Sequence, residues 1–248
     1  MPLGPYDGPS VRRRGPVSVG GVERRARRTK GPSYGKLRSI QKPVFPSFLL
    51  WIDGVGARKL ICGPSLIIGG PAASSKQQAD LCLEAPLSRQ HLSLQRRGEH
   101  LILDAHVETD CGGKALTGPH PLSFPTSPGQ HLTLTMAKVA TVRLRRPLPG
   151  NGTTVIEVTS SHRWQPRVDG VLWLERACVF GPGPFAHIEC SLGGNARCVL
   201  FQEAGRLWFR PPEGMAWQLD DQEFTAPQPV TANATVECGD LRFRIEVA

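Results

Sequence analysis

The chain has 248 residues, of which 40% are apolar, and it is rich in glycine (27) and proline (23). This length fits one large all-β domain or two small ones, and frequent glycine and proline argue against long helices. The formal net charge of +9 lies in residues 1–42, which carry eleven basic and two acidic side chains. The rest of the chain carries nineteen of each, which excludes a basic globular domain of the kind that binds nucleic acid.

Residues 1–42 form an N-terminal tail rich in glycine, proline, serine and arginine. Because it lacks a periodic apolar pattern, we expect it to be disordered. Its arginine clusters, Arg12–Arg14 and Arg24–Arg28, suit contact with nucleic acid, an anionic surface or an acidic partner. An extension that only aids solubility explains them equally well.

From residue 43 onward the chain consists of short apolar runs separated by turn signals. Several runs alternate polar and apolar residues, as a strand with one buried face does. The expected strands of this first part are Phe48–Ile52, Arg58–Cys62, Ser65–Ile68, Asp80–Leu83, His91–Arg96, Leu101–Asp104, His131–Met136 and Val139–Arg145.

A segment rich in proline and glycine, residues 147–152, separates these strands from a second series. We therefore expect one domain over residues 43–150 and another over residues 151–248. The strands expected in the second domain are Thr154–Val158, Val171–Leu174, Cys178–Phe180, Ala186–Glu189, Cys198–Gln202, Arg206–Arg210, Thr235–Cys238 and Leu241–Val247.

The two domains resemble each other in sequence, which indicates an internal repeat. The run that ends at Gly69 matches the run that ends at Gly181, and residues 79–83 match residues 186–190. Continued without a gap, this alignment sets Leu92 against Val199, and it sets the segment Ser88–His91 against Asn195–Cys198. The serine, arginine and histidine of that segment are thus expected in the first domain alone.

Seven cysteines are spread along the chain without a C-x-x-C pair. Several lie within apolar runs, so we expect buried free thiols in a reducing compartment, and a cytoplasmic location. The N-terminus has no apolar segment typical of a secretory signal. The longest apolar run, Phe48–Ile52, is too short to span a membrane.

The segment Leu87-Ser88-Arg89-Gln90-His91 brings a hydroxyl, a guanidinium and an imidazole into one loop between strands. Such groups bind anions, although they also occur in ordinary turns. A strand ending in glycine, then Ser-x-x-His, a hairpin, a glycine-rich turn and a late pair of strands resembles the forkhead-associated (FHA) domain. The resemblance covers roughly Phe48 to Leu148, with the motif Leu49–Gly56 at its start, and a degenerate second copy covers Val168 to Val247.

This resemblance implies an all-β fold of two tandem FHA-like β-sandwiches after the tail. In the family, loops at one end of the sandwich bind phosphothreonine peptides. By this resemblance Ser88 would bond the phosphate, Arg89 would face phosphate or peptide, and His91 would brace the loop. Gly69 matches the glycine of the family's Gly-Arg pair.

Two positions depart from the family pattern. Gly70 stands in place of the arginine, and Gly112, within Cys111-Gly112-Gly113-Lys114, stands in place of an asparagine. Lys76 or Lys114 can substitute for the arginine as point charges, without its bidentate geometry. The glycines at 69, 112 and 113 are also simply explained as turn residues.

Catalytic and metal-binding motifs are missing from the sequence. It has no nucleophile elbow, phosphate-binding loop or H-E-x-x-H motif, and its seven histidines lack metal-ligand spacing. We therefore expect a non-catalytic protein-interaction module without a cofactor that binds a phosphorylated or acidic protein. The alternatives are an FHA-type scaffold that binds proteins without phosphate, and nucleic-acid or anionic-surface binding through the tail.

Overall fold

The computed structural model describes residues 46–72, 79–98, 100–125 and 129–248. The expected disordered tail, residues 1–42, and Lys76 lie outside these ranges. Residues 43–248 form one compact unit. All regular elements in the described ranges are β-strands, which confirms the all-β class. No helix in those ranges is long and apolar enough to cross a membrane.

The strands before residue 150 follow the predicted ones closely, with one addition. They are β1 (Ser47–Ile52), β2 (Gly56–Cys62), β3 (Ser65–Gly69), β4 (Leu81–Leu83), β5 (Leu92–Arg97), β6 (His100–Cys111), β7 (Lys114–Leu122), β8 (Leu132–Met136) and β9 (Ala140–Arg145). The addition, β7, contains Pro119 and Pro121, which cannot donate backbone hydrogen bonds. It tolerates them because it pairs only with β6, at an edge of the sheet.

The strands after residue 150 include four short ones that the sequence analysis missed: β11, β17, β18 and β19. The full set is β10 (Thr154–Val158), β11 (Trp164–Gln165), β12 (Gly170–Leu174), β13 (Ala177–Gly181), β14 (Ile188–Glu189), β15 (Cys198–Glu203), β16 (Arg206–Arg210), β17 (Trp217–Leu219), β18 (Gln222–Phe224), β19 (Gln228–Val230), β20 (Thr235–Cys238) and β21 (Leu241–Val247).

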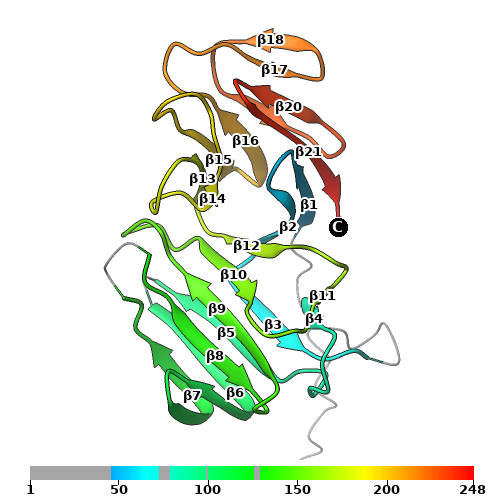
Figure 1. Cartoon of the computed structure of the whole chain (residues 1–248), viewed down its shortest axis with the longest axis vertical. Coiled ribbons are helices and arrows are strands. Elements are labelled where there is room, and N and C mark those ends of the chain that lie inside the picture. The colour runs from blue at the N-terminus through cyan, green and yellow to red at the C-terminus, as the bar shows by residue number, and fades with distance from the viewer. Residues whose placement is uncertain (1–45, 73–78, 99, 126–128) are drawn as a thin grey trace, which may run out of the picture. The chain divides into compact units, whose positions relative to one another are not determined.

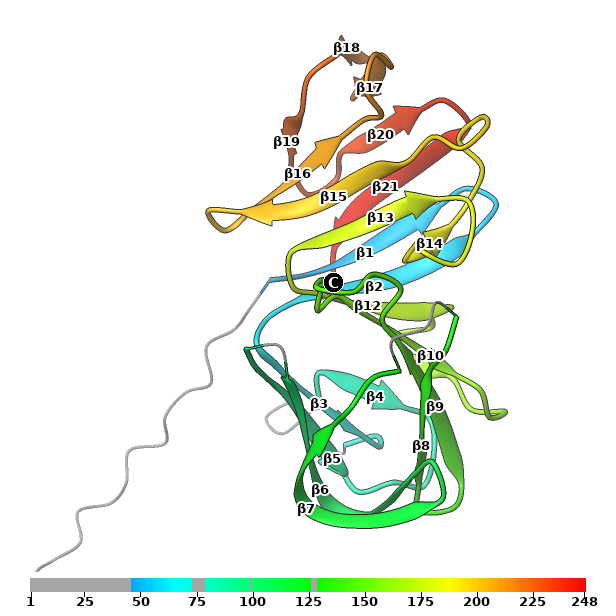
Figure 2. The same cartoon turned by 90° about the vertical axis from the view of Figure 1, so that its left-hand side faces the viewer.

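A first β-sandwich is built from one sheet that folds over on itself at β6. The strand order β11-β4-β3-β5-β6 continues directly into β8-β9-β10-β12. The first half of β6 pairs with β5, whereas Thr109–Cys111 pair with β8, and the register of β6 with β7 shifts between Ala105 and Thr109. This bulge lets one strand serve both layers, which lie opposite each other in Figure 2.

A second β-sandwich consists of two layers, and its strands come from both ends of the described chain. One layer continues the first sheet in the order β12-β2-β1-β21-β20-β17-β18, and the other is a separate five-stranded sheet, β14-β13-β15-β16-β19. In Figure 1 the blue β1 and the red β21 lie side by side, and their pairing joins Leu50 to Ile245.

Three strands, β2, β10 and β12, contribute to the cores of both sandwiches. On β12, Val171 and Trp173 belong to the first core, whereas Leu172 and Leu174 belong to the second. The same alternation occurs on β10, where Ile156 belongs to the first core and Val155 to the second. Because successive side chains point to opposite faces, a strand between two cores is apolar throughout, as the fully buried Gly170–Leu174 is.

The strands β1 and β2, which fall within the first expected domain, pack with the second sandwich. We placed residues 43–62 in the first domain, but Leu50, Ile52, Leu60 and Cys62 pack in the second core. Since β10 and β12 also complete the first core, the boundary between residues 150 and 151 does not separate the packing of the two sandwiches. The division into an FHA domain and a degenerate copy stays a prediction.

One order of strand pairing occurs in both sandwiches, and the internal repeat stays a prediction. The order β4-β3-β5-β6 of the first sandwich recurs as β14-β13-β15-β16, with parallel pairing of the first two strands and antiparallel pairing of the others. Equivalent pairs are Ile68↔Leu92 and Phe180↔Cys198.

These pairs correct the ungapped alignment by one residue, because Leu92 corresponds to Cys198 and not to Val199. Burial explains the shift. Leu92 and Cys198 both point inward, whereas a slip of one residue would turn every side chain of the strand to the other face.

Candidate functional site

The loop between β4 and β5 carries three of the predicted site residues, Ser88, Arg89 and His91, and lies directly on the end of β3. The amide of Gly70 donates to the Ser88 carbonyl at 2.9 Å, and the amide of His91 donates to the Ile68 carbonyl at 2.9 Å. The amide of Leu87 donates to the Ala85 carbonyl at 2.7 Å, within the loop itself. Backbone hydrogen bonds thus hold the loop on both sides of Ser88 and Arg89.

The glycine pair at the end of β3 is required by this close approach. A Cβ atom at Gly69 would overlap the carbonyl oxygen of Arg89, and one at Gly70 would overlap that of Leu87. Both glycines are buried. No side chain therefore fits at Gly70 without a shift of the backbone.

The side chains of Ser88, Arg89 and Gln90 are exposed at the tip of the loop. A hydroxyl and a guanidinium on adjacent residues can donate hydrogen bonds to an anion, and charge-assisted bonds are about twice as strong as neutral ones. The loop thus presents donors to solvent on a fixed backbone.

His91 is fully buried, and its backbone rather than its ring holds the loop. Its carbonyl accepts hydrogen bonds from the amides of His106 at 3.0 Å and Val107 at 3.2 Å. Within the described ranges neither ring nitrogen has a hydrogen-bond partner. Burial lowers the pKa of His91, and the backbone of Glu108 opposes this shift. The imidazole is therefore a neutral core group.

His106, which the sequence analysis did not single out, braces the loop from the bulge of β6. Its Nδ1 lies 3.2 Å from the Gln90 carbonyl, which can only accept, so this nitrogen carries the proton. Its Nε2 lies 3.9 Å from the Asp104 carboxylate. No local pattern would reveal this role, because it depends on where the bulge places residue 106.

The hairpin Cys111–Lys114 belongs to the part of β6 that lies beyond the bulge. The Gly112 amide donates to the carbonyl of Thr133 in β8 at 3.2 Å, and the Gly113 amide donates to Asp110 Oδ1 at 2.9 Å. Gly112 follows Val107, whose amide donates to the His91 carbonyl, by five residues along the strand, or about 16 Å. A hydrogen bond thus connects Gly70 with the loop, whereas hydrogen bonds connect Gly112 with β8 and Gly113 with β6.

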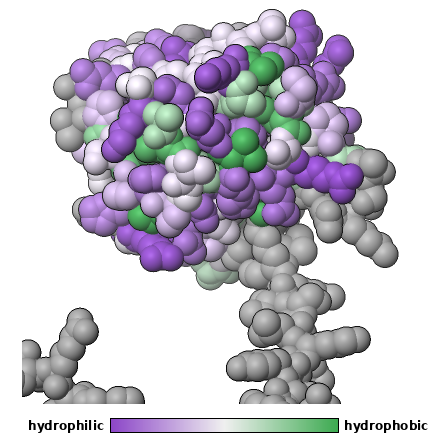
Figure 3. Space-filling view, turned by 90° about the horizontal axis from the view of Figure 1, so that it is seen from below, coloured by the Kyte–Doolittle hydropathy of each residue, from purple (hydrophilic) through white to green (hydrophobic). Residues whose placement is uncertain are grey.

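Lys114 is exposed at the end of the hairpin, where it pairs with Cys111. Lys76 is not among the described residues. Seen from below, the end of the molecule that carries β6 and β7 is mostly hydrophilic, with hydrophobic residues in small separate areas (Figure 3). A ligand at this end would meet polar and charged groups rather than a large apolar platform.

The cysteines are all free, as expected. Cys62, Cys82, Cys178, Cys198 and Cys238 are buried, and Cys111 and Cys190 are half-buried. Burial raises the pKa of Cys62 and of Cys238 to about 11, so these thiols are protonated and unreactive. Within the described part of the chain, no group of three or more His, Cys, Asp or Glu residues is placed to hold a metal ion.

Comparison with known proteins yields one structural similarity. No family model matches the chain, and no curated protein matches it. Among solved structures, the chain is similar to the N-terminal FHA domain of EssC, a component of the bacterial Type VII secretion apparatus. The sequences are 13% identical, the match covers 80% of this chain and 92% of that chain, and the TM-score is 0.24.

Proposed function

We propose that the protein is a non-catalytic protein-interaction module of the FHA type, and that its β4–β5 loop binds a phosphorylated or acidic peptide. The observation that carries the proposal is the exposure of Ser88 and Arg89 on a loop whose backbone is held against β3 and the bulge of β6. A phosphate carries close to two negative charges near pH 7 and needs such fixed donors.

Arg89 takes the place of the arginine that Gly70 cannot supply. A guanidinium can bind a phosphate with two parallel hydrogen bonds, and an exposed one can turn toward a ligand that Ser88 holds. Lys114 and Lys76 stay candidates for a further charge contact, and Gly112 and Gly113 for backbone contacts to the peptide. In this proposal the second four-strand group, β13 to β16, is a degenerate copy that provides structure only.

Titration with a phosphothreonine peptide library tests the proposal. We expect binding at moderate ionic strength, at least tenfold weaker binding by the Ser88→Ala and Arg89→Glu variants, and loss of binding after phosphatase treatment of the peptides. Ser123→Ala, at another exposed serine, is the matched control and should bind as the wild type does. Absence of any binding, or full binding by Ser88→Ala, would exclude the phosphate site.

A scaffold that binds proteins without phosphate is the second candidate, and the glycine at position 70 favours it. An arginine–phosphate contact in a desolvated site is worth about 2–5 kcal/mol, and its loss can abolish micromolar binding. The scaffold predicts that partners captured by the protein remain bound after phosphatase treatment. Release of those partners by phosphatase would count against it.

A further inference from the structure

A groove of about 540 Å³ lies between the β1–β2 hairpin and the connection from β10 to β12. We call it the Trp51 groove. Its main lining residues are Trp51, Ala57, His162, Arg163, Arg167 and Asp169. Sites for small ligands and peptide side chains commonly have volumes in this range.

Trp51 is the most exposed of the large aromatic side chains that line the groove, at 44%. Its indole Nε1 donates to Glu246 Oε2 at 2.9 Å, which fixes the orientation of the ring. The residue opposite it on β2 is Ala57, whose small side chain leaves the ring uncovered. An exposed tryptophan in a fixed orientation is typical of the residues that dominate protein interfaces, since it buries a large area at low entropic cost.

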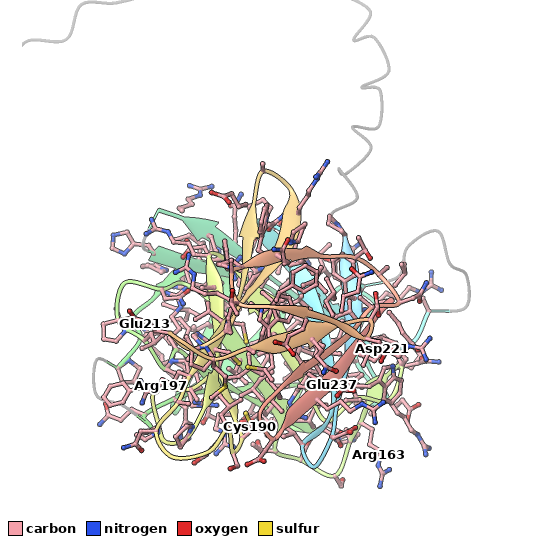
Figure 4. The ribbon with its side chains drawn as sticks, turned by 90° about the horizontal axis from the view of Figure 1, so that it is seen from above. Arg163, Cys190, Arg197, Glu213, Asp221 and Glu237 are labelled. Carbon is pink, nitrogen blue, oxygen red and sulfur yellow. The ribbon has the colours of Figure 1, made fainter. Side chains whose placement is uncertain are left out.

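Two of the charged groups in the groove, the guanidinium groups of Arg163 and Arg167, are available to bind a ligand. Asp169 is already compensated, because its Oδ2 accepts the Ala57 amide at 2.8 Å and lies 3.9 Å from Arg58 Nη1. Arg163 and Arg167 are exposed, and their side chains form no hydrogen bond or ion pair with another described residue. Figure 4 shows the Arg163 side chain projecting outward at the rim of the molecule.

A strand edge adjoins these two arginines. β11, which contains the groove residue Trp164, ends the order of the large sheet and pairs with β4 on one side only, among the strands that the structure describes. Its outer edge is short, since β11 has two residues and is followed by Pro166, and it offers the backbone groups of Trp164 and Gln165 to an extended chain. Such pairing is a recurrent mode of peptide recognition, and a nucleotide would not use it.

We propose that the Trp51 groove is a docking site for an acidic peptide segment that carries an aromatic or aliphatic side chain. The apolar side chain would lie on Trp51, and the acidic residues would face Arg163 and Arg167. The site contains none of the residues of the β4–β5 loop and needs no phosphate. It therefore goes beyond the proposed function and can exist without it.

The test uses the full chain and a displayed library of twelve-residue, unphosphorylated peptides rich in aspartate and glutamate, each with one apolar residue. Enriched peptides should bind Trp51→Ala and the double variant Arg163→Glu/Arg167→Glu at least tenfold more weakly than the wild type. Trp51→Phe should retain most of the affinity. All variants keep the basic tail, so its non-specific attraction for acidic peptides cancels in the comparison.

The indole N–H signal of Trp51 in a ¹H–¹⁵N spectrum gives a direct readout, and it should shift when an enriched peptide is added. Ser88→Ala is the control that separates the two sites: it should weaken phosphothreonine peptides and leave the acidic peptides unaffected. The proposal is overturned if no enriched peptide depends on Trp51, if Ser88→Ala weakens the same peptides equally, or if ATP shifts the indole signal and the peptides do not.

Discussion

The imidazole Nδ1 of His187 accepts a hydrogen bond from the backbone amide of Val179 at 3.1 Å. In the first sandwich the carboxylate of Asp80 accepts the amide of Ile67 at 2.8 Å, at the equivalent position of the repeat. A carboxylate thus accepts an amide of β3, and an imidazole accepts the corresponding amide of β13. Because Nδ1 accepts, the ring of His187 is held as the neutral tautomer with its proton on Nε2.

We expect stability to fall as the solution is acidified below neutral pH. Burial and, next, the charge of Arg145 lower the pKa of His187 from 6.5 to about 4. Between these values the unfolded chain binds a proton that the folded chain does not, so stability is lost as pH falls from about 6.5 to 4. The slope attributable to this group is at most about 1.4 kcal/mol per pH unit.

Urea unfolding at several pH values between 4 and 8 measures this effect. His187→Asn, which cannot titrate, should show a smaller dependence of the unfolding free energy on pH than the wild type. Some dependence should remain, since burial also lowers the pKa of His91. His131→Asn, at an exposed site, serves as the control. An unchanged slope in His187→Asn would show that His187 titrates normally in the folded protein.

Gly70→Arg, which introduces the arginine that the resemblance to FHA domains implies, should destabilise the protein and should not improve phosphopeptide binding. Its Cβ would overlap the Leu87 carbonyl, so β3 and the β4–β5 loop must move apart. Overpacking of this kind costs about 3 kcal/mol. Thermal unfolding followed by circular dichroism measures the loss.

Gly112→Asn introduces the asparagine that the resemblance to FHA domains implies, and it is the matched comparison for Gly70→Arg. Gly112 has φ of +60° and nothing within 4 Å of a Cβ, and asparagine adopts this conformation more readily than most residues. We expect a cost below about 1 kcal/mol. A Gly70→Arg protein as stable as Gly112→Asn would show that the loop adapts easily.

Arg96→Lys should weaken the junction between the two sandwiches. The Arg96 guanidinium donates to the carbonyls of Gly63, Trp173 and Leu174 at 2.6–3.0 Å and lies 3.7 Å above the Trp173 ring. An ammonium group cannot reproduce this planar set of contacts. We expect a loss of about 3 kcal/mol, measured by urea unfolding, and a changed tryptophan emission. Arg97→Lys, at an exposed site, should cost almost nothing.

A chain cut after residue 150 should not fold. Residues 43–150 lack β10 and β12, so the first core would lose Ile156, Val171 and Trp173 and expose the apolar residues that they cover. Residues 43–248 should fold and unfold in one cooperative transition, because three strands serve both cores. Dispersed amide NMR signals from the shorter chain, or two separate transitions in the longer one, would contradict the shared core.

Local patterns in the sequence were enough to predict most of the strands and the polar groups of the β4–β5 loop. Alternating and continuous apolar runs mark strands such as β5 and β12, because burial of side chains follows directly from their period. Short strands such as β11 were not predicted, since two residues cannot show an alternation of polar and apolar side chains. The strand β7 was not predicted because it contains prolines, which a strand tolerates only at the edge of a sheet.

Which strands share a core, and which residues surround the loop, depends on contacts between distant parts of the chain. β1 pairs with β21, and the Trp51 side chain donates a hydrogen bond to Glu246, which lies 195 positions away in the chain. No local pattern encodes such a partner, because pairing depends on the complementarity of surfaces formed by distant segments. For the same reason the steric need for glycine at position 70, the brace from His106 and the Trp51 groove became visible only once the strands were in place.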